Sequence, residues 1–330
     1  MAKRMYRLCM EGIVCACGAS ALELYRSSKR LIPTLLDKPR TGKVAGLMVP
    51  PRQFLEDDMT ARGVTKQPYH VLVDGNHGYN PRRDIHAVAC YHPLPPRSLI
   101  KIDKGFWVTS PELTFIQICA DEDLSDFDII SLGYELCGTY VLDDSWDGLT
   151  CIDESLTSTE KIGRLINSIH RVPGIKRARN LIKHVHDLSN SPMETILAML
   201  VSLPTTKGGL GLGPISLNHP VATPVGQRRV DIGFPRQRVG LEYQGKEFHS
   251  IEAVGRDARR QNKIVGSGFT ILNVWYEDLI DEHLFQQLVT DLFRALGIRK
   301  RIRVTGYHTL QKLLRIQLMP AIKAYGSNEF

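Results

Sequence analysis

The sequence of 330 residues lacks any long apolar run. The longest apolar candidate near the start, residues 12–24, contains Cys and Gly and falls short of the roughly 18 consecutive apolar residues that a membrane span needs. It also lacks the shape of a cleavable signal peptide. We therefore expect a cytoplasmic protein with no membrane partner.

Cysteines are few, and they do not form the paired clusters of a zinc site. The seven cysteines are an odd number in a chain too large to depend on disulfides. Cys9, Cys15 and Cys17 lie near one another, but no second cluster would complete a four-ligand zinc site. The pattern indicates reduced thiols that are buried or half-buried.

Basic residues are absent from residues 105–160, and charge is unevenly divided along the whole chain. Residues 1–160 contain 17 Lys and Arg against 22 Asp and Glu, whereas residues 161–330 contain 25 against 13. We therefore expect a domain boundary near residue 160. A basic half attracts polyanions, because neutralised phosphates release counterions, but an ordinary solvated surface can have the same composition.

The first half, residues 1–160, has the pattern of an α+β domain and shows no catalytic motif. Its predicted elements are a helix at residues 18–25, strands at residues 69–74 and 99–103, and a helix that begins after Ser110.

The second half, residues 161–330, predicts a compact α/β core at about residues 187–297 and a basic helical tail at residues 298–330. The predicted elements are helices at 161–170, 175–188 and 192–203, strands at 229–234 and 239–244, a basic helix at 257–263, a strand at 269–275 and a helix at 277–296. This order places an acidic cluster at one edge of the predicted sheet.

Two of these strands form a predicted hairpin that carries the acidic cluster. The four residues Pro235–Arg238 have the chemistry of a turn, so Phe234 lies opposite Val239. Counting outward places Asp231 opposite Glu242, and Gln244 lies on the same face as Glu242. Two carboxylates are therefore expected close together, with a neutral amide beside them.

Paired carboxylates are costly unless a cation lies between them. Mg²⁺ binds one or two carboxylates, and it can activate water for attack on a phosphodiester. The residues equally allow a hairpin at the surface, whose acids are satisfied by the nearby Arg229, Arg236 and Arg238. Spacing alone leaves both interpretations open.

Residues from about 187 to 297 resemble the bacterial relatives of the very-short-patch-repair endonuclease, within the PD-(D/E)XK superfamily. The residues that carry the resemblance are Pro192–Glu194, Val230–Pro235, Gly240–Gly245, His249, Asp257, Arg260 and Gly268–Leu272. The resemblance implies a restriction-endonuclease-like mixed sheet flanked by helices. It also implies metal-dependent hydrolysis of DNA with Mg²⁺ or Mn²⁺.

The resemblance gives roles to individual residues of the hairpin. Asp231 and Glu242 match the two acids that bind metal. Gln244 stands where the motif usually has a Lys that orients or activates the attacking water. An amide can still position water, but it supplies no positive charge. Lys246 is a candidate substitute for that charge.

Residues on either side of the hairpin have two interpretations each. Glu194 matches an acid that often reaches the metal, but Ser191 with Glu194 three residues later is also a capping box. His249 can contact a phosphate or act as an acid, or it can be an ordinary histidine. Asp257 and Arg260 lie one helical turn apart and can form an ion pair. The expected contacts to a nucleic-acid backbone are Lys246, Arg259, Arg260 and Lys263.

The first half faintly resembles the body of abortive-infection type IV antitoxins, through Cys17–Tyr25 and His92–Pro96. That resemblance implies a defence or toxin–antitoxin context. We predict an endonuclease-like protein whose partner is DNA, and the acidic half is a candidate surface for a protein partner. The alternative is a catalytically inactive, nucleic-acid-binding or antitoxin-like regulator built on a nuclease fold.

Overall fold

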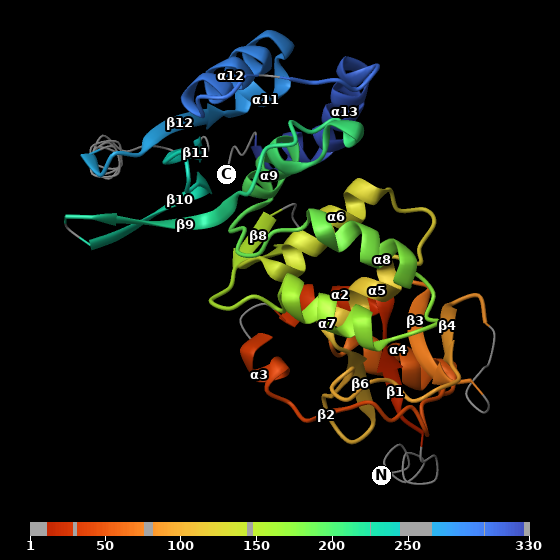
Figure 1. Ribbon diagram of the computed structural model, residues 1–330. Coiled ribbons are helices and arrows are strands. Elements are labelled where there is room, and N and C mark those ends of the chain that lie inside the picture. Colours follow the sequence, from red (N-terminus) through yellow and green to blue (C-terminus); the bar gives the residue numbers. More distant parts are fainter. Residues whose placement is uncertain are drawn as a thin grey trace. The chain divides into compact units, whose positions relative to one another are not determined.

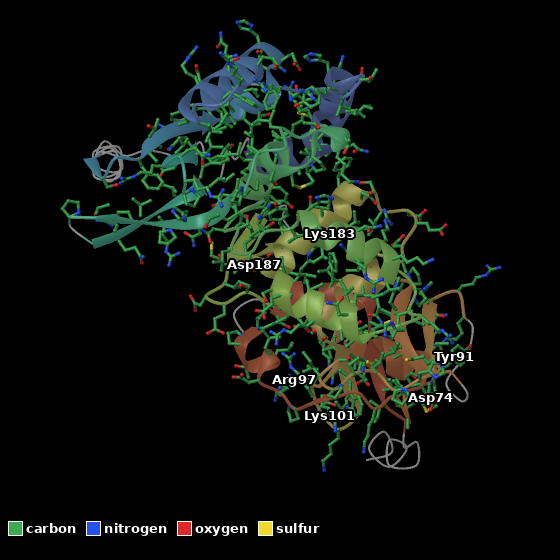
Figure 2. All side chains as sticks on the ribbon, viewed as in Figure 1. Asp74, Tyr91, Arg97, Lys101, Lys183 and Asp187 are labelled. Carbon is green, nitrogen blue, oxygen red and sulfur yellow. The ribbon has the colours of Figure 1, made fainter. Side chains whose placement is uncertain are left out.

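The computed structural model describes residues 12–28, 32–75, 82–143, 148–224, 226–244, 266–299 and 301–326 (Figure 1). The chain divides into two compact units, which are described separately. Unit 1 comprises Met1–Cys137, Val141–Trp146 and Thr150–Lys183, and unit 2 comprises Gly138–Tyr140, Asp147–Leu149 and His184–Phe330. Figure 2 shows that side chains fill the spaces between the ribbons within each unit.

Unit 1 is built on a six-stranded mixed sheet with the strand order β2-β5-β6-β1-β3-β4. β1 is parallel to β6, β3 is parallel to β4, and the other pairs are antiparallel. The strands are β1 (Val14–Ala16), β2 (Arg40–Thr41), β3 (Tyr69–Asp74), β4 (Ile85–Cys90), β5 (Leu99–Lys101) and β6 (Phe106–Thr109). β1 and β6 are fully buried, because they lie in the middle of the sheet and are apolar except for Thr109.

Seven α-helices accompany this sheet in the described part of unit 1. They are α2 (Gly18–Ser28), α3 (Ile32–Leu36), α4 (Arg52–Thr60), α5 (Pro111–Ile118), α6 (Asp126–Cys137), α7 (Thr159–Ser168) and α8 (Ile175–Leu181). The predicted start of α5 is confirmed, since Ser110 Oγ accepts a hydrogen bond from Leu113 N and Pro111 is the first helical residue.

The boundary between the units lies at residues 183 and 184 and differs from the one expected near residue 160. α7 packs on α5, and α8 packs on α5 and α6, so both helices belong to unit 1. The change in charge at residue 160 is therefore a change of surface composition within one core. A short two-stranded sheet pairs β7 (Tyr140–Asp143) with β8 (Gly148–Cys151).

Unit 2 contains a four-stranded sheet with the strand order β12-β11-β10-β9. The strands are β9 (Ser216–Thr223), β10 (Gly226–Phe234), β11 (Val239–Gln244) and β12 (Thr270–Trp275). β9 was not predicted, because Asn218 and Pro220 are unusual in strands; proline is tolerated here because β9 is an edge strand. The predicted hairpin, β10–β11, is therefore central, and the expectation that it lies at a sheet edge is wrong.

Four helices flank this sheet in the described part of unit 2: α9 (Pro192–Ser202), α11 (Tyr276–Ile280), α12 (Glu282–Ala295) and α13 (Tyr307–Gly326). Short 3-10 turns occur at Ile182–His184 and Thr205–Lys207. The predicted helix at residues 277–296 is divided, because Asp281 ends α11 and caps α12 by accepting from Leu284 N. α13 packs on α9 and α11, as expected for the tail.

The chain is a mixed α/β protein, as predicted at that level. Cys15 and Cys17 are buried free thiols, and burial raises the pKa of both, so they are unreactive core residues. Among the described helices, none is long and apolar enough to cross a membrane.

Candidate active site

The register of the β10–β11 hairpin matches the prediction. Phe234 pairs with Val239, and Ile232 pairs with Leu241. One step further outward the same register places Asp231 opposite Glu242. The two carboxylates therefore come from adjacent strands, each one residue beyond the last residues paired between them, Ile232 and Leu241.

Asp231 lies at the point where β10 and β11 separate. Paired residues between these two strands end at Ile232 and Leu241, whereas β10 remains paired with β9 as far as Gly226. Instead of a main-chain acceptor, the Oδ2 atom of Asp231 accepts the hydrogen bond of Tyr243 N, at 2.8 Å. The carboxylate is thus held where the pairing of the two strands ends.

Close packing leaves little room for a side chain at two glycines that contribute to the family resemblance. A Cβ atom on Gly233 would lie 2.6 Å from the Cβ of His219, and one on Gly240 would lie 2.9 Å from the Cδ1 of Ile271. Gly233 therefore excludes a side chain regardless of catalysis, whereas a side chain at Gly240 would require the terminal methyl of Ile271 to shift. These glycines support the fold of the hairpin but carry no information about chemistry.

Glu242 is the more buried of the two acids, with 8% of its surface exposed. Its Oε1 atom is inaccessible to solvent. Main-chain pairing with β12 continues through this residue, because Glu242 is the partner of Asn273 in a parallel ladder. A buried carboxylate held on a central strand is a rigid ligand for a cation, since neither its backbone nor its surroundings can move far.

Gln244 is held by a residue that the sequence did not identify. Its Nε2 atom donates a hydrogen bond to Oδ1 of Asn273, at 2.9 Å. Asn273 and Thr270 are the polar residues of β12, and of these two residue types asparagine is depleted in strands whereas threonine is enriched. An asparagine in a predicted strand was therefore the feature of the sequence that could have pointed to a role for Asn273 beside the hairpin.

Glu194 is near Asp231 but is turned back toward the start of α9. Its carboxylate oxygens accept hydrogen bonds from Asn190 N at 2.9 Å and from Ser191 Oγ at 3.3 Å. Ser191 Oγ in turn accepts from Glu194 N, at 3.2 Å. Burial and then the charge of Asp231 raise the pKa of Glu194 to about 8, against the lowering effect of the two hydrogen bonds. These contacts favour the capping interpretation.

The arginines around the hairpin contact main-chain oxygens. Arg229 donates to the carbonyl of Asn218 at 3.0 Å. Arg238 donates to the carbonyl of Ser267, and its guanidinium lies 5.8 Å from the centre of the Phe269 ring. Arg238 thereby ties the hairpin turn to the segment that leads into β12.

Several predicted site residues lie outside the described residues. These are Lys246, His249, Asp257, Arg259, Arg260 and Lys263. Within the part of the chain that the structure describes, no group of three or more His, Cys, Asp and Glu side chains is arranged to hold a metal. The available carboxylates are the pair Asp231 and Glu242, and this pair fits Mg²⁺, which binds one or two protein carboxylates and keeps several waters.

Comparison with protein-family models, curated proteins and solved structures finds no match to this chain.

Proposed function

We propose that unit 2 is a metal-dependent endonuclease-like domain that hydrolyses phosphodiester bonds of DNA. The observation that carries the proposal is the position of Asp231 and Glu242, which each lie one residue beyond the last residues paired between the two central strands, Ile232 and Leu241. The resemblance to the PD-(D/E)XK superfamily, restriction-endonuclease-like in fold, supports the same conclusion.

Asp231 and Glu242 are the residues that would hold Mg²⁺ or Mn²⁺. Tyr243 N fixes the orientation of the Asp231 carboxylate, and burial fixes that of Glu242. When bound, the cation would lower the pKa of a bound water and stabilise negative charge on the phosphate. The two residues contribute hard oxygen ligands, which match that class of cation.

Gln244 would orient the attacking water. Because its Nε2 donates to Asn273, its Oε1 is directed away from that bond and can accept a hydrogen bond from water. Asn273 then acts as a positioning residue, since its hydrogen bond to Nε2 of Gln244 leaves Oε1 of Gln244 facing the water. Glu194 would hold the start of α9 beside Asp231. The DNA backbone would be bound by the basic and histidine side chains predicted for that role: Lys246, His249, Arg259, Arg260 and Lys263.

The second candidate function is a catalytically inactive module that binds nucleic acid, in a defence or antitoxin-like context. It is favoured by Gln244, which replaces the usual Lys and whose side-chain amide donates a hydrogen bond to Asn273. A site without that positive charge stabilises the developing negative charge less well. The acidic half of the chain would then serve as a surface for a protein partner.

Cleavage of a supercoiled plasmid tests the proposal. With Mg²⁺ or Mn²⁺ the wild-type chain should nick the plasmid. Asp231→Asn and Glu242→Gln should each lower the rate on the order of 100-fold or more. Asp291→Asn is the matched control, because Asp291 is an exposed acid on α12 paired with Arg294.

Binding measured in parallel separates the two candidates. Retardation of the plasmid in a gel without cleavage, in every divalent metal tried, would favour the inactive binding module. If Gln244→Lys then gained cleavage, loss of the charged residue would be the reason for inactivity. Cleavage that persists in both Asp231→Asn and Glu242→Gln would contradict the proposed site.

A further inference from the structure

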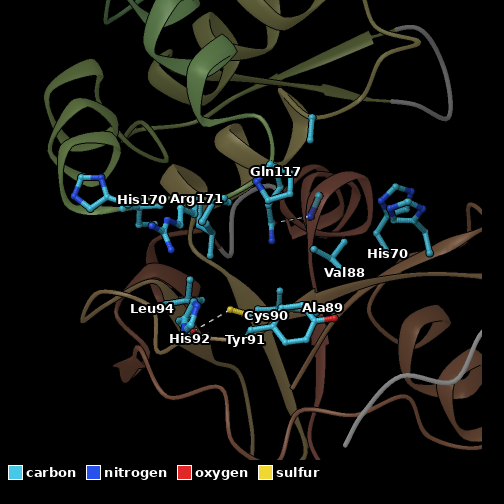
Figure 3. A pocket seen from close by; sticks show the side chains of 18 of the residues that line it. His70, Val88, Ala89, Cys90, Tyr91, His92, Leu94, Gln117, His170 and Arg171 are labelled. Atoms are coloured by element: carbon cyan, nitrogen blue, oxygen red, sulfur yellow. Dashed lines mark hydrogen bonds between the residues drawn. The ribbon is translucent and has the colours of Figure 1, made fainter. Parts of the chain in front are cut away.

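A large cavity lies in unit 1 and is lined by residues between Gly18 and Pro173, a range in which the sequence predicts no catalytic motif. Its volume is about 1200 Å³, whereas small-molecule sites are typically about 300–1,000 Å³. One wall is formed by alternate residues of β3 and β4, which share a face of the sheet: His70, Leu72, His86, Val88 and Cys90. Other walls come from the end of α5, the segment that follows β4 and the segment between α7 and α8 (Figure 3).

Two imidazole rings form a flat surface at one end of this cavity. His70 and His86 are paired residues of β3 and β4, and their rings stack with centroids 4.6 Å apart and an interplanar angle of 26°. Burial, and then the proximity of His86, lowers the pKa of His70 to about 4, so this ring is neutral at pH 7. Leu72 and Val88 continue the wall, and the whole surface suits a planar heteroaromatic ring.

Gln117 presents a hydrogen-bond donor to the cavity. Its Oε1 atom accepts from Gly18 N at 3.0 Å, and this contact fixes the orientation of the amide. Its Nε2 atom makes no hydrogen bond to any described residue, and Figure 3 shows the side chain directed into the cavity. Gln117 is therefore a donor of fixed direction that a ligand acceptor can satisfy.

Asp121 supplies an acceptor close to the histidine end. It also lines the cavity, and its charge acts on His70. One of its oxygens, Oδ1, accepts from Asp123 N at 3.0 Å, and the carboxylate has a second oxygen. Some nucleobases carry a ring acceptor beside an exocyclic amino group. The edge of such a base is recognised by a donor such as Gln117 and an acceptor such as Asp121, placed beside a flat wall.

The opposite end of the cavity carries positive and titratable groups. Figure 3 shows His170, Arg171 and His92 away from His70. Arg171 has a φ of 61°, a left-handed conformation that is uncommon for residues other than glycine. Its guanidinium makes no hydrogen bond or ion pair with the described residues. An arginine presented in this way can bind a phosphate with two parallel hydrogen bonds.

We propose that this cavity binds a nucleotide whose base carries an exocyclic amino group. The base stacks on the His70–His86 wall, and its edge is read by Gln117 and Asp121. The phosphate lies at Arg171 and His170. The carboxylates of Glu122 and Asp123 accept hydrogen bonds from the pentose hydroxyls, as acids commonly do in nucleotide sites. The site is separate from the proposed metal site of unit 2 and does not depend on it.

Calorimetry of the full chain with AMP and IMP tests the proposal directly. The two nucleotides differ along one edge of the base, where the amino group of AMP is replaced by a carbonyl and the ring acceptor beside it becomes an N–H donor. AMP should bind at least on the order of 10-fold more tightly, because IMP would face Asp121 with an acceptor. Adenosine and ribose 5-phosphate should each bind more weakly than AMP. EDTA in the buffer removes any contribution from divalent metal in unit 2.

Matched variants locate the binding. Gln117→Glu keeps the oxygen that accepts from Gly18 N but removes the donor, so it should weaken AMP binding on the order of 10-fold. Arg171→Asn should weaken AMP but leave adenosine unchanged. The control is Arg97→Asn, because Arg97 also has a positive φ, 75°, and is not among the residues that line the cavity; Figure 2 shows it apart from Tyr91. Asparagine tolerates that conformation at both positions.

Three outcomes would overturn the proposal, and two of them require only the wild-type chain. Equal affinity for AMP and IMP would remove the base-reading role of Gln117 and Asp121. Binding of spermidine or a basic peptide, with no binding of any nucleotide at millimolar concentration, would identify the cavity as a site for cations. Binding of AMP that is unchanged in both Gln117→Glu and Arg171→Asn would place the nucleotide elsewhere.

Discussion

Ser191 and Glu194 hold the first turn of α9, and through it the surroundings of Asp231. Ser191→Ala removes the acceptor of Glu194 N and one donor to the Glu194 carboxylate. Loss of such a cap costs about 1 kcal/mol. Amide exchange in α9, measured by mass spectrometry, should become about fivefold faster.

Ser202→Ala is the control for that measurement, because Ser202 Oγ donates to Ala198 O at the other end of α9 and caps nothing. Its exchange should change by less than about twofold, which corresponds to a few tenths of a kcal/mol. Equal effects of the two variants would show that Ser191 is no more than an ordinary polar residue of this helix.

His70 should remain neutral far below the usual range of histidine. Its pKa is lowered to about 4 by burial and by His86, against roughly 6.5 in an unfolded chain. The folded state therefore binds fewer protons, so the stability contributed by neutral His70 is complete above pH 6.5. It is lost as the pH falls from about 6.5 to 4. Because the ring is partly exposed, that loss should be on the order of 1–2 kcal/mol.

NMR titration of the imidazole resonances measures this shift. The His70 resonance, assigned by its disappearance in His70→Gln, should titrate near pH 4. A midpoint near pH 6.5 would show that the ring is freely solvated and would also weaken the stacking wall of the cavity.

The residues of the candidate site differ in how well the sequence predicts them. Asp231 and Glu242 follow from a turn of four residues, because a short connection fixes the register of a hairpin. Asn273 could not be predicted in the same way. It reaches Gln244 through the parallel pairing of β11 with β12, and the sequence that joins these strands does not determine their register.

At the scale of elements, a buried arginine in the last helix of unit 2 connects α13 to α11 and α12. Arg315 of α13 is 5% exposed and pairs with Glu282 of α12. It also donates to the carbonyls of Leu279, at 3.1 Å, and Ile280, and its guanidinium lies 4.5 Å from the Phe285 ring centre. One side chain thus donates hydrogen bonds to the last carbonyl groups of α11 and connects three helices.

Arg315→Gln should therefore destabilise the contact of α13 with α11 and α12 by about 1–3 kcal/mol, because several carbonyl and carboxylate acceptors lose a charged donor. Amide exchange in α12 and α13 should accelerate at least about fivefold. Arg294→Gln removes an exposed ion pair with Asp291 and should cost less than about 1 kcal/mol. Similar acceleration in both variants would show that Arg315 behaves as a surface residue.

Elements were predictable from the sequence where local patterns determine them. The capped helices α5 and α9 and the strands β10 and β11 are examples. β9 was missed because an edge strand can accept Asn218 and Pro220, which a pattern of strand-forming residues excludes. The break at Asp281 was missed because the apolar spacing continues across it, although its side chain caps the next helix.

At the scale of the whole molecule, charge has to be considered within the two units. The segment 161–183 contains seven Lys and Arg and no acid, yet it belongs to unit 1. Arg177 pairs with Asp126 at 3.0 Å and donates to the carbonyls of Asp121 and Leu124. Part of this basic charge therefore stabilises the acidic segment before it and does not indicate a nucleic-acid surface.

Titration of Mn²⁺ into the full chain by calorimetry tests the central proposal most directly, because it depends on the pair Asp231 and Glu242 and not on finding the right substrate. The account predicts saturable binding that is lost in Asp231→Asn and in Glu242→Gln and is kept in Asp291→Asn. Absence of binding to the wild-type chain, or binding that both site variants retain, would contradict it.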